Sequence, residues 1–476
     1  MAEQPKHDQT LTRTAVAVIA GALAMLFDTT IVSVALRTLA EDLHASVATI
    51  QWVSTAFLLA LGVTIPLVSW AQSRLGGKRL WILAQSVFLI ASVLCGLAWN
   101  VESLIAFRAL QGVGGGIMLP LMMTLVVRAA QGRSLGRVMS TMSLPAVIGP
   151  ILGPVVGGLI LNSLDWRWMF WINIPLCLIG IVTAALLLPA DEPARRVRLD
   201  VAGLLLVSPA VVGLLFGLSN AGRDGGFARA DVLIPLLAGA ALLAAFALWA
   251  VRKKDDALID VRLLRHRPLA TASTLMFLSG FALYGAMLLL PLYWQEVRGR
   301  EVLEAGLLLA PQGIGSLLSR SIAGRLVDRI GARAVSVAGF LVVTVATVPF
   351  AFAGTNTNQW LLMAALVVRG AGLGAATIPP MTVAFMGIER PDVPHASVIT
   401  RIATQVGGSF GVAVLGVILH ATTTGARSGA DLAAGFDRAF WWAVGLAAAG
   451  AALSLMLPAR QPAVPAPATA KEPVAA

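Results

Sequence analysis

The sequence predicts an all-α polytopic membrane protein. Of its 476 residues, 58% are hydrophobic and only 12% are charged, whereas about 25% of the residues in a soluble domain are charged. Long uncharged stretches recur along the whole chain, and about 20 apolar residues suffice to cross a bilayer as a helix. Helices are required because lipid offers no partners to backbone polar groups. Lys and Arg gather in alternate loops, as membrane topology demands.

The apolar runs define 14 predicted transmembrane spans. In order, they cover about 14–36, 49–69, 80–99, 103–127, 137–161, 170–189, 200–220, 231–251, 271–292, 303–323, 334–353, 360–386, 396–420 and 439–458. An even number of spans places both ends of the chain on one side. Most of the 35 Lys and Arg fall in loops on the side of the N-terminus, so the positive-inside rule predicts that both termini are cytoplasmic.

Charged and polar segments divide the chain into six parts. We predict a cytoplasmic N-terminus (1–13), an N-terminal six-helix bundle (14–190), two inserted transmembrane helices (200–251), a cytoplasmic connector (252–270), a C-terminal six-helix bundle (271–458) and a disordered cytoplasmic tail (459–476). The tail is rich in Ala and Pro and cannot build a core. The connector carries both charged and apolar residues, which favours a short amphipathic helix on the inner surface.

The two predicted bundles repeat one another. The segment "SWAQSRLGGKR" (69–79) follows the second span, and "GRLVDRIGAR" (324–333) follows the tenth, so that Ser73 and Asp328 align 255 positions apart. Arg108 and Arg369 align in the same way at an offset of 261. Two pairs at nearly one offset indicate a duplicated six-helix unit. Repeats of this kind are typical of secondary transporters, with the site at the interface of the repeats.

One carboxylate lies deep in a predicted span. Asp28 sits in "AMLFDTTIVSVAL" (24–36), where an ionised Asp costs roughly 2.5–3.5 kcal/mol on insertion scales. It must therefore face protein or water, and it is a candidate proton carrier, an anchor for a cationic substrate, or both by competition. The alternative is a structural Asp that caps a neighbouring helix or pairs permanently with an Arg.

Other classes of chemistry find little support. The five histidines are dispersed, and the two cysteines lie in apolar spans without disulfide or metal spacing. No phosphate-binding loop of the Gly-x-x-x-x-Gly-Lys-Ser/Thr type occurs. The net charge of +11 resides in loops and forms no aromatic-interleaved basic patch for nucleic acid. We expect a protein that is not an enzyme and that holds neither metal nor cofactor.

Six motifs in matching spans closely resemble the major facilitator superfamily, and most of all its fourteen-span drug:proton antiporters. They are "LFDTTIVSVAL", "RALQGVGGG", "GPILGPVVGG" (149–158), "DWRWMFWINIP" (165–175), "GRLVDRIGAR" and "QVGGSFGVAVLG" (405–416). The resemblance covers about residues 14–458 and implies the major facilitator fold, with two six-helix bundles plus two inserted helices. It also implies a multidrug efflux protein with the proton as coupling ion.

The resemblance assigns roles to the buried charges. The acid that matches Asp28 is implicated in proton and drug coupling, and the Arg that matches Arg108 in proton transfer. Spans 1 and 4 are neighbours in this fold, so Arg108 is expected to hold Asp28 ionised until a proton or drug arrives. The alternative for Arg108 is a side chain that snorkels to the outer interface. Arg369, its repeat mate, has no acid to which the sequence pairs it.

Two further groups of residues are predicted to act in conformational change. Glycines four apart share one face of span 5 and permit close approach, while prolines bend the helix; the family treats this stretch as its antiporter motif. Short loops after spans 2 and 10 are expected to latch the inner gate. The alternatives are ordinary tight packing and solvated turns. The residues of the span 5 stretch are Gly149, Pro150, Gly153, Pro154, Gly157 and Gly158, and those of the inner gate are Arg74, Gly324, Asp328, Arg329, Gly331 and Arg333.

The first gating loop departs from the family pattern. Ser69 and Ser73 stand where the family has Gly and Asp, whereas the second copy is intact. We therefore expect a weaker latch in the first half. In span 13, Thr404 stands where an Arg usually precedes the Gln, and Arg401 lies one turn earlier.

Aromatic residues offer a tentative substrate cavity. Flat lipophilic cations bind aromatic faces through cation–π contact, although interfacial belts and lipid-facing packing are commoner fates of such rings. The candidates are Trp52, Phe57, Phe277, Phe281 and Tyr284.

The sequence thus predicts a proton-driven exporter of lipophilic, cationic drugs or toxic compounds in the plasma (inner) membrane of a bacterium. An alternative keeps the fold but exports one endogenous metabolite or antibiotic. A membrane sensor or scaffold would not transport at all, and a membrane enzyme would need a polar catalytic cluster that the sequence lacks. The sequence leaves open whether the protein acts alone or passes substrate to a periplasmic adaptor and an outer-membrane channel.

Overall fold

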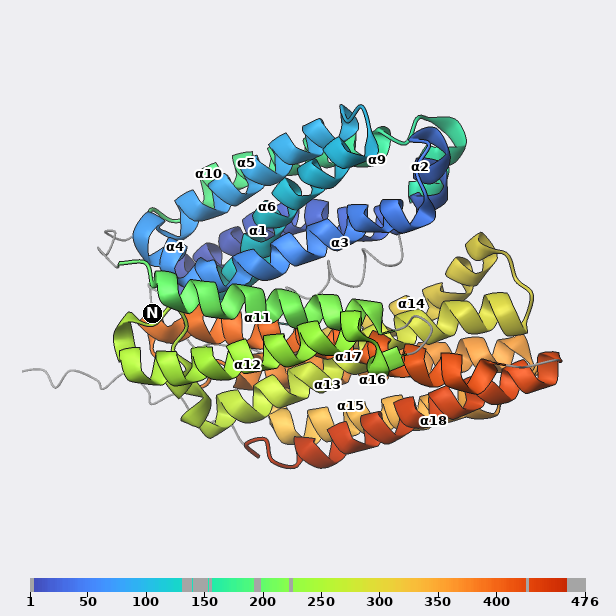
Figure 1. Ribbon diagram of the computed structural model, residues 1–476. Helices are drawn as coiled ribbons and strands as arrows, with labels where there is room; N and C mark the ends of the chain where they lie inside the picture. Colours follow the sequence, from blue (N-terminus) through green and yellow to red (C-terminus); the bar gives the residue numbers. More distant parts are fainter. Residues whose placement is uncertain are drawn as a thin grey trace, which may run out of the picture.

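The chain forms a long bundle of helices in the computed structural model, which describes residues 4–130, 139, 153, 156–191, 198–221, 226–424 and 428–459. No strand occurs among these residues. Figure 1 shows the helices running roughly side by side, with the N-terminal ones in one group and the C-terminal ones in another. The predicted all-helical fold class is confirmed for this part of the chain. The tail beyond 459 and most of the predicted fifth span lie outside the described residues.

Each half contains long helices joined by short connections. The N-terminal half comprises α1 (Gln4–Val34), α2 (Leu36–Asp42), α3 (Val47–Thr64), η1 (Ile65–Leu67), α4 (Val68–Leu75), α5 (Gly77–Gly96), α6 (Val101–Ala130), helical residues 156–163, α9 (Trp168–Trp171) and α10 (Asn173–Leu187). The middle comprises α11 (Val201–Asn220), η2 (Gly226–Ala228), α12 (Ala230–Lys253), η3 (Lys254–Asp256) and η4 (Val261–Arg265). The C-terminal half comprises α13 (Arg267–Leu292), η5 (Tyr293–Val297), α14 (Val302–Ile330), α15 (Ala332–Thr347), η6 (Val348–Phe352), α16 (Gln359–Val383), η7 (Arg390–Asp392), α17 (Val393–Thr423) and α18 (Gly429–Ser454).

Within the described residues, 11 helical stretches are long and apolar enough to cross a membrane. The chain is therefore a multi-pass membrane protein. Two more of the predicted spans correspond to α14 and α18, which are long enough but less apolar.

The two halves use the same packing pairs. In the N-terminal half α3 and α5 pack on α6, and α1 packs on α10; in the C-terminal half α14 and α15 pack on α16, and α13 packs on α18. These pairs follow the order of the sequence repeat. The inserted helices α11 and α12 pack on each other, and α11 also contacts both α3 and α17.

The repeat extends to single residues in the loops. Gly76 joins α4 to α5 with φ 86° and ψ 165°, and Gly331 joins α14 to α15 with φ 92° and ψ 159°. A positive φ of this size favours glycine, because a Cβ would clash with the backbone. Two residues later, Lys78 Nζ donates to the carbonyl of Leu188, and Arg333 Nε donates to that of Leu457. The first contact joins α5 to the end of α10, and the second joins α15 to the end of α18. In each half these are the third and the sixth of the predicted spans.

The halves meet at one end of the bundle, the N-face, which carries Thr10, Gly76 and the connector 254–266. Here one apolar core contains residues of both halves, such as Met118 and Val127 with Val327 and Val398. Towards the opposite face, separate cores belong to the N-terminal and the C-terminal half. Figure 1 shows the group that contains α1–α10 diverging from the other towards the end where α2 and α9 lie. A core that the two halves share therefore closes the N-face, and towards the opposite face the cores of the described residues are separate.

The connector differs from its prediction. It forms the two short 3-10 turns η3 and η4, and it does not form the predicted amphipathic helix. Ala257, Leu258 and Ile259 of the connector are buried in the shared core. The reason is Asp200, which is 3% exposed and holds the connector from the start of α11. Its carboxylate accepts from Gly203 N–H, Trp249 Nε1, Lys253 Nζ and Leu258 N–H.

Candidate functional site

Asp28 lies on the buried side of α1, about one and a half turns before the helix ends. Its side chain is 0% exposed. The neighbouring Thr29 and Thr30 hydroxyls donate back to carbonyls of α1, Thr29 to Leu26 and Thr30 to Phe27. Both hydroxyls thus find hydrogen-bond acceptors within their own helix, as Thr side chains in apolar helices do. The carboxylate of Asp28 is left to partners on other helices.

Arg108 of α6 is the charged partner of Asp28. Its Nη1 lies 2.5 Å from Asp28 Oδ2 and 2.7 Å from Gln111 Oε1, and its Nε donates to the carbonyl of Val53 at 3.1 Å. The guanidinium carbon stands 4.3 Å from the centroid of the Phe57 ring. Arg108 is 1% exposed. It is therefore held inside the protein and does not snorkel to the interface.

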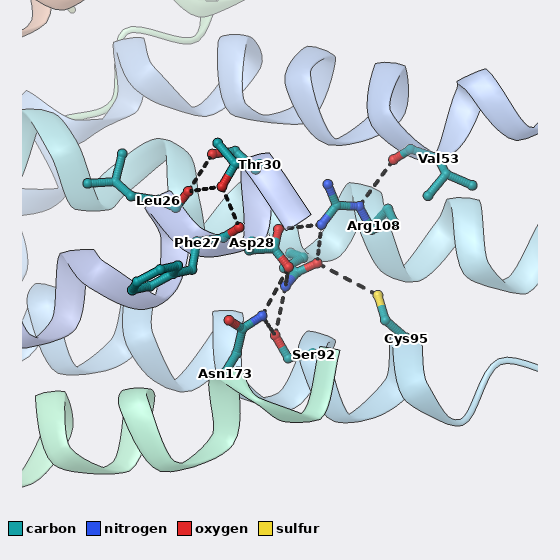
Figure 2. Close-up of polar contacts among 11 residues, drawn as sticks. Leu26, Phe27, Asp28, Thr30, Val53, Ser92, Cys95, Arg108 and Asn173 are labelled. Carbon is teal, nitrogen blue, oxygen red and sulfur yellow. Dashed lines mark hydrogen bonds and ion pairs between the residues drawn. The ribbon is translucent and has the colours of Figure 1, made fainter. Parts of the chain in front are cut away.

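Three polar side chains that sequence reasoning missed complete the cluster. Gln111 Nε2 donates to Asp28 Oδ1 at 2.9 Å and to Ser92 Oγ at 2.7 Å. Asn173 Nδ2 lies 3.0 Å from Asp28 Oδ1 and 3.3 Å from Ser92 Oγ. Figure 2 shows Arg108 on one side of Asp28, with Asn173 and Ser92 on the other. Gln111 and Asn173 lay inside quoted motifs, whereas nothing in the sequence marked Ser92.

The arrangement gives the cluster a defined chemistry. Each oxygen of Asp28 accepts at least one hydrogen bond, so the ionised form is well stabilised despite burial. Protonation would remove the ion pair and leave Arg108 buried with neutral partners only. A buried charge that loses its partner is strongly unfavourable. The pair is therefore stable only while both partners are charged and in contact.

The span 5 glycines that are described lie against α1 next to this cluster. A Cβ at Gly153 would overlap the Thr30 side chain, and one at Gly157 would touch Ile31 at 3.4 Å. Gly158 has open space around it. Close approach of Gly153 to the segment that holds Asp28 thus depends on glycine, whereas a Cβ would fit at Gly157 and Gly158. Gly149, Pro150 and Pro154 lie outside the described residues.

The five predicted cavity aromatics do not gather at one place. The Phe57 ring belongs to the Asp28 cluster, and Trp52, 43% exposed, packs 6.0 Å from Phe216 of α11. Phe277 lies 5.8 Å from Phe410 of α17. Phe281 is buried in the core of the C-terminal half, while the Tyr284 ring lies against Gly408 of α17.

Arg369 occupies the place that the repeat assigns to it, with different partners. Its Nε donates to Thr347 Oγ1, its Nη1 to Gln312 Oε1 and its Nη2 to the carbonyl of Ala282. All of these partners are neutral. The C-terminal half therefore holds a buried cation where the N-terminal half holds an ion pair.

The gating residues lie at the N-face. Arg74 is exposed in the last turn of α4, Asp328 and Arg329 are exposed in the last turn of α14, and Gly324 is buried in that helix. In the first half a different acid appears, because Asp191 accepts from Lys78 N–H at 2.7 Å and Arg79 N–H at 3.0 Å. Asp191 ends "LPAD", and the equivalent place in the second half reads "LPAR" (457–460). The first half thus places a carboxylate, that of Asp191, at the start of α5.

A family model described as Major Facilitator Superfamily matches residues 18–412 and 275–475 of this chain. The chain belongs to this superfamily. The Multidrug resistance protein B homolog of Mycobacterium tuberculosis (strain ATCC 25618 / H37Rv) is 36% identical over 415 residues, covering 87% of this chain and 77% of the relative. The Multidrug transporter protein MdtP of Bacillus subtilis (strain 168) is 28% identical, covering 84% and 74%. The Lincomycin resistance protein LmrB of Listeria monocytogenes serovar 1/2a is 27% identical, covering 91% and 93%.

Solved structures of low sequence identity share the major facilitator fold. The human organic anion transporter MFSD10 (TETRAN) superposes with a TM-score of 0.64 at 14% identity, over 94% of this chain and 99% of that chain. A double Trp mutant of XylE gives 0.65 at 15% identity, over 95% and 96%. The relatives named here are multidrug and lincomycin resistance proteins, and this chain is a membrane protein of the same superfamily.

Proposed function

We propose that this transporter exports lipophilic drugs or toxic compounds across the plasma (inner) membrane of a bacterium in exchange for protons. It would do so as a fourteen-span drug:proton antiporter with both termini in the cytoplasm. The observation that carries the proposal is the fully buried pair of Asp28 and Arg108, set in a hydrogen-bonded cluster on α1 and α6. With cytoplasmic termini, the closed N-face is the inner gate and the described state faces outwards.

The proposed cycle follows from the ion pair. A proton that arrives from outside neutralises Asp28 and removes the ion pair. Arg108 then keeps its existing hydrogen bonds to Gln111 Oε1 and to the Val53 carbonyl. After the halves rock, a substrate from the cytoplasm favours loss of the proton. Lipophilic cations are the first cargo to test, because a cation competes with Arg108 for the carboxylate. One carboxylate would exchange one proton per drug molecule.

The test compares coupled and uncoupled transport in proteoliposomes. We expect an imposed pH gradient to drive uptake of a fluorescent lipophilic cation by the wild type and not by Asp28→Asn. Exchange of a labelled neutral lipophilic substrate for its unlabelled form without a gradient should persist in Asp28→Asn, because such a substrate needs no carboxylate and the neutral side chain mimics one fixed protonation state. Glu304→Gln is the control, since Glu304 forms an exposed ion pair with Arg300.

Two results would count against the proposal. If Asp28→Asn loses exchange and gradient-driven uptake alike and also unfolds more easily, the ion pair is structural. If the variant keeps gradient-driven uptake, the proton enters elsewhere. A panel of anionic, neutral and cationic substrates then separates multidrug export from export of one endogenous metabolite or antibiotic.

A further inference from the structure

A cavity of about 530 Å³ lies at the N-face, away from the Asp28 cluster. Its lining comes from both halves of the chain, with α1, α4, α6 and the end of α10 on one side and Arg390 and Pro391 on the other. Its volume falls within the range of small-molecule sites. Any occupant of this cavity therefore touches the two halves at once.

The charge of the lining is positive. Among the lining residues that the structure describes, Lys78, Arg128 and Arg390 are three cations, and Asp191 is the one carboxylate. Both oxygens of Asp191 already accept backbone N–H groups at the start of α5. The Arg390 side chain makes no hydrogen bond or ion pair with the described residues. The cavity thus favours an anion and disfavours a lipophilic cation.

Two buried polar side chains point to a missing polar partner. Gln72 is 4% exposed and Thr14 is 1% exposed, and both line the cavity. Neither the amide of Gln72 nor the hydroxyl of Thr14 has a hydrogen-bond partner among the described residues. Leaving such groups buried and unpaired costs about 1–3 kcal/mol each. A ligand with several acceptor oxygens would satisfy them.

The boundary between the two halves at this cavity, here called the seam, also carries the contacts that close the N-face. Arg128 Nη2 donates to the carbonyl of Arg390 at 3.2 Å, and Thr124 Oγ1 lies 3.0 Å from Ser397 Oγ. A ligand that needs both sides of the seam binds only when the seam is closed. By linkage, its binding must favour that closed state.

We propose that this cavity is a binding site for a phosphate group, which stabilises the closed N-face. The phosphate belongs either to a phospholipid headgroup of the adjoining leaflet or to a soluble anion, since both present the same tetrahedral oxygens to Lys78, Arg128 and Arg390. The proposal concerns gate closure and does not depend on which drug is carried or on proton coupling.

The experiment measures closure directly in the full-length protein. Spin labels on Leu75→Cys and Arg325→Cys, exposed residues of α4 and α14, report the distance between the halves at the N-face. The native Cys95 and Cys177 are buried and stay unlabelled. The protein is placed in nanodiscs of phosphatidylcholine, with and without inorganic phosphate, and in nanodiscs that also contain phosphatidylglycerol. Binding of radiolabelled phosphate is measured in parallel in neutral detergent.

We expect the ratio of closed to open molecules to rise by the factor 1 + [L]/Kd for the ligand that binds. Lys78→Gln and Arg390→Gln should each lower that affinity by about fivefold or more. Arg79→Gln is the matched control, because Arg79 is an exposed cation beside Lys78 that does not line the cavity. Lys78 also holds α10, so Arg390→Gln keeps the test valid if Lys78→Gln misfolds.

Each outcome decides the proposal. A response to inorganic phosphate supports a soluble anion, and a response to phosphatidylglycerol alone supports a lipid headgroup, provided that Arg390→Gln removes it. The proposal is overturned if neither ligand changes the distance. It is also overturned if Arg79→Gln weakens the response as much as Arg390→Gln, since surface charge in general would then explain the effect.

Discussion

Asn173 Nδ2 lies 3.0 Å from Asp28 Oδ1, although the two residues are 145 positions apart in the chain. Asn173 is the first residue of α10, and α10 packs along α1. Its amide thus donates to the carboxylate from the side opposite Arg108. Neutral donors as well as a cation therefore hold the Asp28 carboxylate in place.

Asn173→Leu should move the pH profile of transport to higher pH. The substitution keeps the size of the side chain but removes one donor to the ionised carboxylate, and such a donor favours the charged form. A hydrogen bond to a charged group contributes about 1.5–3 kcal/mol, which corresponds to about one to two pH units. The midpoint of gradient-driven uptake against external pH measures the shift.

Gln85→Leu is the control for this prediction. Gln85 of α5 is also a buried amide, but neither of its polar side-chain atoms has a partner among the described residues. Its replacement should leave the midpoint unchanged. An unchanged midpoint in Asn173→Leu would show that proton uptake does not occur at the carboxylate that Asn173 contacts.

The sequence predicted the helical fold and the ion pair more fully than the rest of the site. Apolar length and charge bias are local properties, so the spans and the acid at Asp28 could be found by inspection. Its pairing with Arg108 came from the resemblance to the major facilitator superfamily, in which spans 1 and 4 are neighbours. Ser92 could not, because a serine in a helix carries no signal until α5 is placed beside α6. Asp191 was missed for a related reason, since its role depends on the turn at Gly76 and not on its own neighbours.

The hydroxyls of Thr124 and Ser397 join the two halves at the N-face, and their loss should open it. Thr124→Val leaves the Ser397 hydroxyl buried without this partner, and a hydrogen bond contributes about 0.5–1.5 kcal/mol. The ratio of closed to open molecules should fall by about fivefold. The distance between labels at Leu75→Cys and Arg325→Cys measures this ratio.

A second hydroxyl pair provides the control. Ser336 and Ser454 lie 2.8 Å apart inside the C-terminal half, on α15 and α18. Ser454→Ala removes a buried hydroxyl contact of the same kind but does not touch the seam. It should change stability without changing the distance between the halves. Equal effects of the two variants on that distance would contradict a gating role for Thr124 and Ser397.

Asp200 should make the stability of the protein depend on pH in the acid range. Burial alone would raise the pKa of Asp200, but hydrogen bonds from Gly203, Trp249, Leu258 and Lys253 outweigh it and hold the pKa below its ordinary value of 3.8. The carboxylate therefore adds stability above pH 3.8, and this stability is lost as the pH falls through the lower folded-state pKa. At neutral pH, Asp200→Asn should cost about 3 kcal/mol, because an amide replaces a charged acceptor.

Thermal unfolding in detergent, followed by tryptophan fluorescence, measures the difference between Asp200→Asn and the wild type at each pH. The difference should be largest at neutral pH and should shrink as Asp200 becomes protonated in the folded wild type. Asp165→Asn provides the comparison, since Asp165 pairs with Arg167 at the surface and an exposed pair contributes less than about 1 kcal/mol. If this stability difference stays constant from neutral to acid pH, the substitution destabilises the protein through the shape of the amide. The charge of Asp200 then does not anchor the connector to α11 and α12.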